Sequence, residues 1–507
     1  MSTIRRQSII SSGVVYFGFL VGLLNTYFFT REGLLFTAPQ YGLTNIFVAI
    51  STLMMAFSTM AMPSYIFKFH PYYNDNLEPS KNDMLTVALT VNTIGFLLVA
   101  AAGWVFKNLV IRKFSANSPE FVNYYEWVFP MGFGLSVYTI LESYTWSIKK
   151  PIVTSFLKEV QWRLFTTVLI VLFFFKVIPD FDLFIKLYAF TYPGIALALL
   201  LYLLFTGKLH LSLQISKVTR RYATKILKLC VFVYSGTIIF FLSQVFDSLV
   251  IASVLTDGTT KVGIFGLATM FTAVIQAPQR AIIATSIPHL SRAWKERDLG
   301  LLQKIYQRSS INLLVFATGI FLLITLNYTE SIITFGLKEE YLLGFSSFVF
   351  LGLTRVVDLG TGVNTEILGT SNYWRFQLIS GIILLTLMLP LTLLLARQWD
   401  IVGTAIAQLV SISIYNGIRI VFLWKKFRLF PFTRHSLYTV LAGLLAAGLT
   451  YFGCRNIHGF PGLVVRSLLF IALYGGAVVY LNLSPDLLPV VDTIKRRLGI
   501  RKKNSGK

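Results

Sequence analysis

The sequence predicts an all-α membrane protein with about fourteen transmembrane helices. Of its 507 residues, 55% are hydrophobic and only 13% are charged, whereas about 25% of the residues in a soluble domain are charged. Apolar runs of about 20 residues recur from end to end, and each is long enough to cross the hydrocarbon layer as a helix. A backbone inside lipid must satisfy its own hydrogen bonds, so these runs are expected to be helical.

The expected helices follow one another along the whole chain. The first apolar stretch comes after Arg5 and Arg6 and is too long for the core of a signal peptide, so we interpret it as a retained span. Short polar or basic loops separate the later stretches. The expected spans are 8–29, 41–67, 84–107, 121–147, 153–177, 182–205, 225–252, 260–290, 307–335, 341–369, 374–397, 401–424, 436–454 and 462–482.

Basic residues between the spans indicate the orientation of the chain. An even number of spans puts both termini on one side, and the side richer in Lys and Arg is expected to be cytoplasmic. Because these residues lie in short loops, the net charge of +23 does not indicate a nucleic-acid partner. We interpret the tail mainly as a topology signal, with contact to anionic lipid headgroups as the alternative. The richest segments are Lys208–Lys228, Arg292–Arg308, Lys425–Arg434 and Lys495–Lys507.

A weak internal repeat suggests two related halves. The run YGLTNIF at 41–47 resembles FGLATMF at 265–271, and Pro63 has a counterpart in Pro288 at nearly the same offset. Parallel repeats of this kind build many transporters. We therefore expect two six-helix lobes with two helices appended. The predicted domains are an N-terminal lobe at 1–206, a basic linker at 207–224, a C-terminal lobe at 225–430, the last two helices at 431–484 and a basic cytoplasmic tail at 485–507.

The sequence offers little for an enzyme. Only Cys230 and Cys454 are present, so a disulfide framework is not expected. The five histidines show no metal-ligand spacing, and no run typical of a nucleotide-binding loop occurs. We find no plausible nucleophile–base arrangement and no pair of carboxylates at a plausible distance. We therefore predict a protein without catalytic activity, metal or cofactor.

Charged residues within the expected spans are the candidate site residues, because charge in hydrocarbon usually faces a bundle interior or a watery cavity. In the span at 341–369 the candidates share one helical face with Gly362, at steps of three and four. The span at 401–424 repeats this spacing. Others lie in the spans at 225–252 and 260–290. Substrate-binding candidates are Gln276, Arg280, Arg355, Gln408, Tyr415 and Arg419; ion-coupling candidates are Asp247, Asp358 and Glu366.

Two interpretations of these charges remain open. In one, arginines bind a phosphate or another anion in a polar cavity, since a guanidinium donates two hydrogen bonds at once. In the other, Arg–Asp or Arg–Glu pairs neutralise each other between helices. Arg280 has no acid within one turn of its own helix, which favours the first interpretation. Arg163 and Arg419 lie near cytoplasmic helix ends, which favours snorkelling to the membrane surface. In the first half, Glu142 lies in the span at 121–147, and Glu159 and Arg163 are spaced four residues apart in the span at 153–177.

Several features together resemble the Wzx-type polysaccharide flippase family of the multidrug/oligosaccharidyl-lipid/polysaccharide exporter superfamily. They are Arg5 and Arg6 before the first span, the run PQYGL at 39–43, Asp247, and the run VGIFGLA at 262–268 followed by Pro288. The resemblance covers the whole chain in length and helix number. It is most specific around Asp247 and residues 262–268.

The resemblance implies a transporter with a central cavity between two lobes. Its cargo would be an undecaprenyl-diphosphate-linked oligosaccharide, the repeat unit of an O-antigen, capsule or exopolysaccharide, moved across the bacterial cytoplasmic membrane by alternating access. Arginines would line the cavity, and H⁺ or Na⁺ could be the coupling ion. A glycan polymerase and export proteins would act with it, and lipids would surround it.

Three alternatives share part of this pattern. A multidrug exporter of the same superfamily would have the same fold but favour an acid-lined cavity. Peptidoglycan-precursor flippases are less similar, because their first lobe carries several inward arginines that the first two spans here lack. A membrane glycan polymerase or glycosyltransferase, which would be an enzyme, is expected to have a longer outer loop.

Overall fold

The computed structural model describes residues 3–34, 36–212 and 214–484, without the side chains of residues 3–12, 281, 284 and 374. No β-strand occurs in these ranges. The chain divides into two compact units, with the boundary between Gly266 and Leu267. The predicted tail at 485–507 and the side chains of Arg5 and Arg6 lie outside the described part. The limits of the two lobes, 1–206 and 225–430, remain predictions from the sequence.

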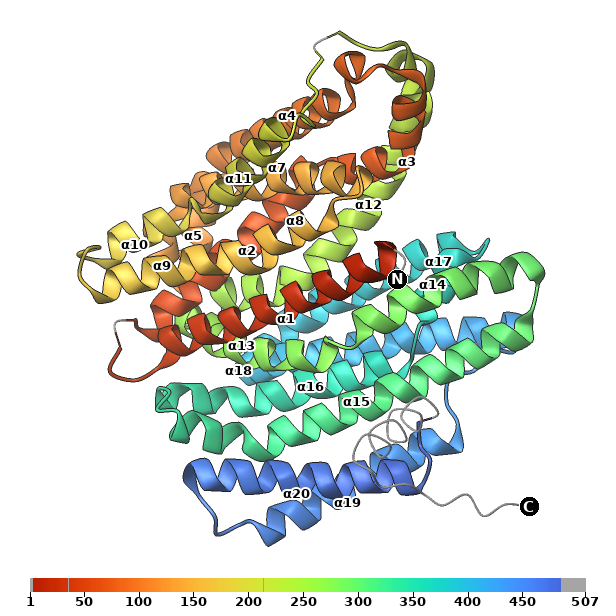
Figure 1. Cartoon of the computed structure of the whole chain (residues 1–507). Helices are drawn as coiled ribbons and strands as arrows, with labels where there is room; N and C mark the ends of the chain where they lie inside the picture. The colour runs from red at the N-terminus through yellow and green to blue at the C-terminus, as the bar shows by residue number, and fades with distance from the viewer. Residues whose placement is uncertain (1–2, 35, 213, 485–507) are drawn as a thin grey trace. The chain divides into compact units, whose positions relative to one another are not determined.

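The first unit contains the helices up to α12 and the start of α13 (Figure 1). Several expected spans consist of consecutive shorter helices. The elements are α1 (Thr3–Thr30), α2 (Ala38–Ser58), α3 (Met62–Asn76), η1 (Pro79–Lys81), α4 (Met84–Val105), α5 (Lys107–Phe114), α6 (Pro119–Asn123), η2 (Tyr125–Trp127), α7 (Val128–Ser147), α8 (Pro151–Phe156), η3 (Leu157–Gln161), α9 (Trp162–Phe174), α10 (Phe181–Tyr188), α11 (Thr191–Phe205) and α12 (Lys217–Val254).

The second unit contains most of α13 and the remaining helices. Its longest element, α18, is two helices joined at a kink, where Trp399 and Asp400 leave the helical conformation. The elements are α13 (Gly258–Gln276), α14 (Gln279–Glu296), α15 (Leu299–Thr334), η4 (Glu339–Leu343), α16 (Gly344–Gly360), α17 (Asn364–Thr370), α18 (Trp374–Phe427), α19 (Arg434–Gly453) and α20 (Gly459–Tyr480).

The chain is a multi-pass membrane protein. Eleven of the described segments are long and apolar enough to cross a membrane. One of them, Arg375–Phe427, contains the two spans expected at 374–397 and 401–424. The spans expected at 121–147 and 153–177 are helical but are not among the eleven. Both carry charged side chains, which lower their mean hydropathy: Glu126 and Glu142 in the first, and Lys158, Glu159, Arg163 and Lys176 in the second.

Two of the predicted continuous helices are interrupted where the backbone turns left-handed. The span expected at 41–67 ends as α2 and restarts as α3, and Met60 and Ala61 between them have φ of 44° and 58°. The span expected at 341–369 breaks between α16 and α17 at Gly362, with φ of 68°. The single helical face that we predicted from Arg355 to Glu366 is therefore wrong, because Glu366 lies on a separate helix.

A proline explains a third interruption. The span expected at 260–290 divides into α13 and α14 at Ala277 and Pro278, because proline has no N–H to continue the helical hydrogen bonds. Pro288 does not end a helix as expected, since α14 continues to Glu296. The echoed run at 41–47 lies near the start of α2, whereas the run at 265–271 lies in the middle of α13 and crosses the boundary between the units. The internal repeat itself stays a prediction.

In the first unit, α2 packs against α4, α7 and α12, and α7 also packs against α11. Close backbone contacts need small residues here. A Cβ atom at Gly18 on α1 would collide with the backbone carbonyl of Glu159, and one at Gly22 would lie 2.9 Å from Nε of Arg163. Gly18 and Gly22, four residues apart, therefore allow close helix packing.

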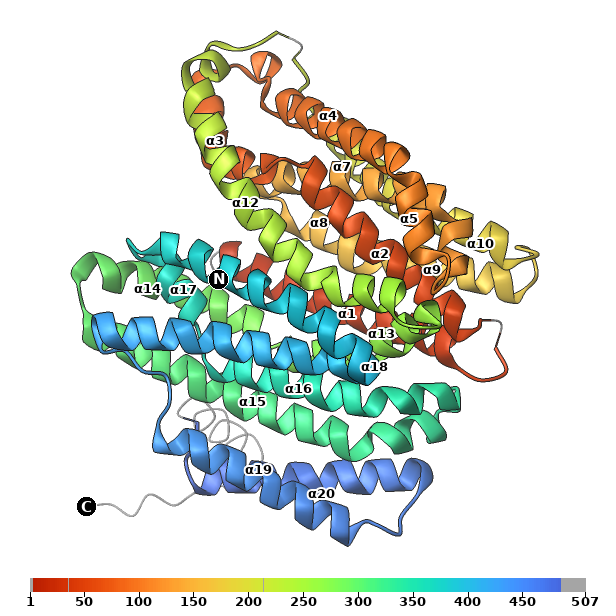
Figure 2. The same ribbon diagram turned by 180° about the vertical axis from the view of Figure 1, so that it is seen from behind.

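In the second unit, α16 packs between α15 and α18, and α19 and α20 lie along α15 (Figures 1 and 2). Tyr474 of α20 donates a hydrogen bond to the carbonyl oxygen of Val315 on α15 (2.9 Å). Glu330 of α15 accepts hydrogen bonds from Arg466 on α20 (3.0 Å) and from the backbone N–H of Gly459 (2.5 Å). These contacts fix the last two helices to the body of the unit.

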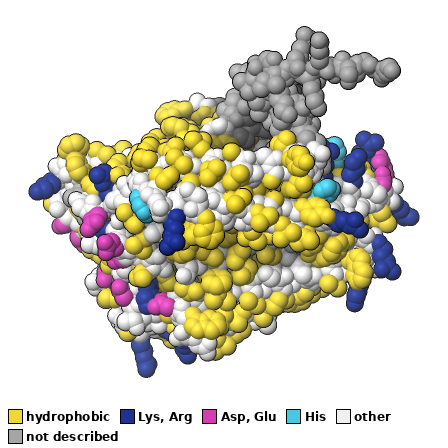
Figure 3. All heavy atoms as spheres, turned by 90° about the horizontal axis from the view of Figure 1, so that it is seen from below, with side chains coloured by type: hydrophobic (Ala, Val, Ile, Leu, Met, Phe, Trp, Pro, Cys, Tyr) yellow, Lys and Arg dark blue, Asp and Glu magenta, His cyan; other side chains and the backbone are white. Residues whose placement is uncertain are grey.

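The surface agrees with a membrane environment. On the face drawn in Figure 3, hydrophobic side chains cover the middle and charged side chains gather at two opposite ends. Many large apolar side chains of α19 and α20 are exposed, among them Leu445, Phe452 and Leu468. Exposed apolar area of this kind is expected where lipid replaces water.

Candidate functional site

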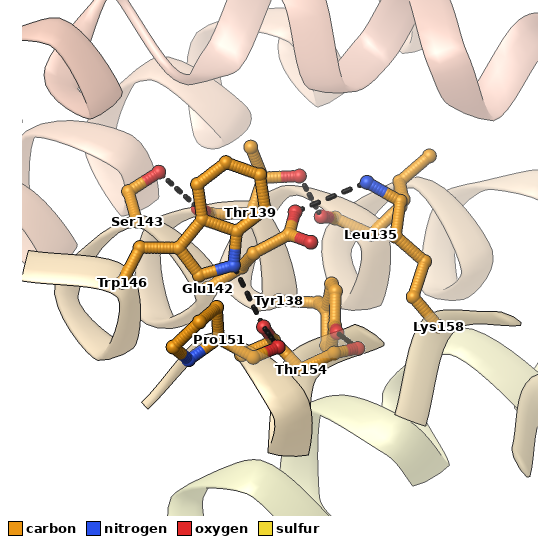
Figure 4. A network of polar contacts seen from close by, with 9 residues as sticks. All are labelled: Leu135, Tyr138, Thr139, Glu142, Ser143, Trp146, Pro151, Thr154 and Lys158. Carbon is orange, nitrogen blue, oxygen red and sulfur yellow. Dashed lines mark hydrogen bonds and ion pairs between the residues drawn. The ribbon is translucent and has the colours of Figure 1, made fainter. Parts of the chain in front are cut away.

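A polar cluster in the first unit centres on Glu142 of α7 (Figure 4). Lys158 donates to a carboxylate oxygen of Glu142 at 3.0 Å. The Glu142 side chain is only 12% exposed, while that of Lys158 is 43% exposed. Thr154 of α8 lies beside this pair: its hydroxyl accepts from Trp146 and its carbonyl from Tyr138, both at 2.7 Å. Two helices that adjoin in sequence are thereby joined by polar contacts.

Lys158 belongs to an unusual stretch of backbone. Residues Leu157–Gln161 form a π-helical turn, η3, and such turns occur often at functional sites. Within the next turn, Arg163 forms an ion pair with Glu159 at 2.8 Å. Asn25 of α1 donates to the carbonyl oxygen of Arg163 at 2.8 Å. The predicted pairing of Glu159 with Arg163 is confirmed, and the pair lies against α1.

A second polar cluster lies in the second unit around Arg419 of α18. Its side chain is fully buried, and its guanidinium carbon lies 3.9 Å from the centre of the Tyr415 ring. Nε donates to the hydroxyl of Ser380 (3.0 Å), and Nη1 donates to the hydroxyl of Thr365 on α17 (2.6 Å). Arg419 therefore does not snorkel to the surface, because these contacts hold it within the unit.

A chain of hydrogen bonds leads from Arg419 to Asp358 of α16. The Thr365 hydroxyl donates to Oδ1 of Asn364 (3.2 Å). Asn364 Nδ2 donates to Oδ1 of Asn416 (2.9 Å), and Asn416 Nδ2 donates to Oδ1 of Asp358 (2.9 Å). Each residue donates a hydrogen bond to the next one in the direction of Asp358. Neutral side chains therefore connect the buried cation with the anion. Glu366 also lies close enough to interact electrostatically with Arg419.

The structure thus brings together four of the predicted site residues: Tyr415, Arg419, Asp358 and Glu366. Asp247 lies elsewhere, on α12 of the first unit, where it is buried. Arg355 is half-buried on α16, one helical turn from Asp358.

The remaining candidates lie apart from the second cluster. Among the described residues, no hydrogen bond or ion pair joins Gln276, Arg280 or Gln408 to it. Gln276 donates to Oε1 of Gln279 (3.0 Å) across the break between α13 and α14. Arg280 directly follows this break and is exposed. Oε1 of Gln408 is buried and accepts no hydrogen bond within the described part of the chain.

Several residues of both clusters are not among the site residues predicted from the sequence. Lys158 lies 16 positions from Glu142, so no helical spacing connects them, although a lysine within an apolar run is a visible signal. Asn364, Asn416 and Ser380 come from three separate helical segments. Their pairing depends on how α16, α17 and α18 pack, which spacing along one helix cannot reveal. Among the described residues, no group of three or more His, Cys, Asp or Glu could hold a metal ion.

The chain has the same fold as several solved structures of membrane transporters. No protein-family model and no curated protein matches the chain. The lipid II flippase MurJ, in an inward closed conformation, superimposes with a TM-score of 0.74 at 16% identity, covering 95% of this chain and 100% of MurJ. The chain has the fold of this transporter. The identity is too low for more than the fold to follow.

Multidrug transporters share the same architecture. An inward-facing multidrug resistance MATE family transporter of the MOP superfamily gives a TM-score of 0.63 at 12% identity, covering 83% of this chain and 98% of that one. The MATE transporter VcmN of Vibrio cholerae, in its bent form, gives 0.53 at 14% identity, covering 84% and 98%. The fold that the resemblance implied is thus confirmed, whereas the Wzx-type family is not tested by these matches.

Proposed function

We propose that this protein is a flippase that moves a polyprenyl-diphosphate-linked oligosaccharide across a bacterial cytoplasmic membrane by alternating access. The observation that carries the proposal is the fold shared with the lipid II flippase MurJ over 95% of the chain. The MATE structures cover 83–84%, so the lipid flippase accounts for more of this sequence. The cargo we propose is the repeat unit of an O-antigen, capsule or exopolysaccharide.

The chemistry of such a cargo fits the residues in the spans. A diphosphate and its sugars cannot enter hydrocarbon unaided, because removing charge from water costs several kcal/mol even after relaxation. Arginines suit phosphate, since the guanidinium donates two hydrogen bonds in a fixed geometry. Among the six substrate-binding candidates, Arg280 alone has an exposed side chain. We therefore assign it direct contact with the diphosphate.

The other candidates receive roles that their surroundings support. Arg419 is fully enclosed by Ser380, Thr365 and Tyr415, which suits a residue that shapes the unit more than one that meets the cargo. Asp247, Asp358 and Glu366 remain our candidates for H⁺ or Na⁺ coupling. A glycan polymerase and export proteins are the partners we propose downstream.

A multidrug exporter is the second candidate function, and the MATE matches favour it. It differs from the flippase in its cargo, which would be a small molecule without a polyprenyl chain. The same acids, Asp247, Asp358 and Glu366, would then serve drug binding or ion exchange. The compound that accumulates in a strain without the protein distinguishes the two functions.

The test is an analysis of lipid-linked precursors in a deletion strain of the native host. The strain is complemented with the wild type, Arg280→Ala, Arg280→Lys or Arg292→Ala, the last being an exposed arginine on the same helix that pairs with Glu296. We expect a polyprenyl-diphosphate oligosaccharide to accumulate on deletion, and the wild type and Arg292→Ala to clear it. Arg280→Ala should fail at normal protein level, with partial rescue by Arg280→Lys.

Three other results would contradict all or part of the proposal. Unchanged precursors and surface glycans in the deletion strain, together with greater drug susceptibility, would establish the exporter instead. Normal complementation by Arg280→Ala would remove Arg280 from the cargo path while leaving the flippase assignment intact. Accumulation of a peptidoglycan precursor would identify lipid II, the cargo named for MurJ, in place of an oligosaccharide repeat unit.

A further inference from the structure

The second unit contains a pocket between α14 and α15. Its volume is about 410 Å³. The two helices are joined by a tight turn, in which Arg297 has φ of 55° and Asp298 accepts from the N–H of Leu301 at 2.8 Å to begin α15. The pocket is therefore framed by a helix pair with a defined connection.

A buried core supports this helix pair. Leu290 of α14, Tyr306 of α15, Ile367 of α17 and Leu423 of α18 are completely buried and pack together. Trp294 of α14 also donates to the carbonyl oxygen of Ile367 at 3.0 Å. Because four helices share this core, the pocket walls are held in place.

The charge of the lining is one-sided. His289 of α14 and Lys304 and Arg308 of α15 line the pocket, and the lining residues in the described part of the chain include no Asp or Glu. In the described structure, Lys304 and His289 form no ion pair. Ser286 and Ser309 add hydroxyl groups and are both nearly buried. Two cationic groups, an imidazole and hydroxyls around one cavity form an environment that suits a phosphate group.

The other part of the lining is apolar. Ile282 of α14 and Leu301 and Ile305 of α15 contribute to the same pocket. A small soluble anion gains nothing by contacting apolar side chains, whereas the first carbons of an acyl chain are stabilised by removal from water. The pocket also lies within the segment Arg292–Arg308 and the helix before it, on the side that the basic loops assign to the cytoplasm.

We infer that this pocket binds the phosphate headgroup of an anionic phospholipid of the cytoplasmic leaflet. His289, Lys304 and Arg308 contact the phosphate, Ser286 and Ser309 supply hydroxyl hydrogen bonds, and the isoleucine and leucine side chains contact the start of the acyl chains. This lipid is a bound component of the second unit and not the transported cargo. The inference therefore does not depend on which compound the protein moves.

The test measures lipid binding to the purified full-length protein in detergent. Phosphatidylglycerol, phosphatidylcholine and inorganic phosphate are added separately, and binding is followed by native mass spectrometry and by the thermal unfolding midpoint. We expect phosphatidylglycerol to bind and to raise the midpoint, and the other two to have little effect. Lys304→Gln should weaken phosphatidylglycerol binding about fivefold, because one basic side chain near anionic lipid contributes about that factor. The double variant Lys304→Gln/His289→Gln should weaken it further.

Lys295→Gln is the matched control, because Lys295 is exposed on α14 but does not line the pocket. It should bind phosphatidylglycerol as the wild type does. Equal losses for Lys295→Gln and Lys304→Gln would mean diffuse electrostatic attraction and would overturn the pocket. Equal binding of inorganic phosphate would replace the lipid by a soluble phosphate compound. Binding unchanged by the double substitution would exclude this pocket as the site.

Discussion

Arg419 and Asp358 carry opposite charges inside the second unit, and hydrogen-bonded neutral side chains connect them. Thr365, Asn364 and Asn416 form the connection, with donor–acceptor distances between 2.6 and 3.2 Å. Within the described residues, Arg419 makes no direct ion pair. The arrangement ties α16, α17 and α18 together, because the connected side chains come from all three helices.

Removing the middle of this connection should destabilise the second unit. Asn416 is buried and contacts both Asn364 and Asp358, so Asn416→Ala leaves the buried Asn364 and the half-buried Asp358 without this partner. We expect the free energy of unfolding to fall by about 1–3 kcal/mol, measured by thermal unfolding in detergent. Asn372→Ala, at an exposed position before α18, is the control and should be neutral. An equal effect of both substitutions would show that the connection contributes nothing specific.

The pair Glu142–Lys158 should show coupled energetics. Lys158→Ala leaves the largely buried Glu142 carboxylate unpaired, and we expect a loss of about 1–2 kcal/mol, reduced by the partial exposure of Lys158. Adding Glu142→Gln removes the unpaired charge, so the double variant should be more stable than the sum of the single effects predicts. A double-mutant cycle of unfolding free energies measures this coupling. Strict additivity would mean that the two side chains do not interact energetically.

Gly362 should tolerate no side chain. Its φ of 68° suits glycine, and a Cβ atom there would lie 2.9 Å from both Oγ of Ser309 and the backbone nitrogen of Ser310. Gly362→Ala is expected to cost at least about 1–2 kcal/mol of stability. Gly417→Ala is the matched control on α18, since no described atom lies within 4 Å of its Cβ position. It should be neutral or slightly stabilising, and a similar loss in both variants would contradict the strain at Gly362.

Glu330 should hold the last two helices against the body of the second unit. Glu330→Gln weakens the contacts to Arg466 and to the N–H of Gly459, because hydrogen bonds to a charged acceptor are about twice as strong as neutral ones. We expect faster hydrogen–deuterium exchange at the start of α20. Glu339→Gln changes an exposed acid of η4 and should leave exchange in α20 unaltered. Unchanged exchange in Glu330→Gln would show that apolar packing alone holds α20.

The sequence was sufficient to predict the membrane class, the approximate position of most helical segments, and the type of fold. These follow from length and hydropathy, which depend on each residue and its near neighbours. It also identified Glu159 with Arg163, because one helical turn brings such pairs together. Tyr415 and Arg419 were on one predicted face for the same reason.

Most of the helix breaks and the contacts between polar groups depend on how the helices pack. Met60, Ala61 and Gly362 take left-handed conformations because packing requires a turn there, and hydropathy does not register a change of direction inside an apolar run. The partners Glu142 with Lys158, and Arg419 with Ser380 and Thr365, come from different helices. Their contacts depend on helix packing, which places residues side by side regardless of their separation along the chain.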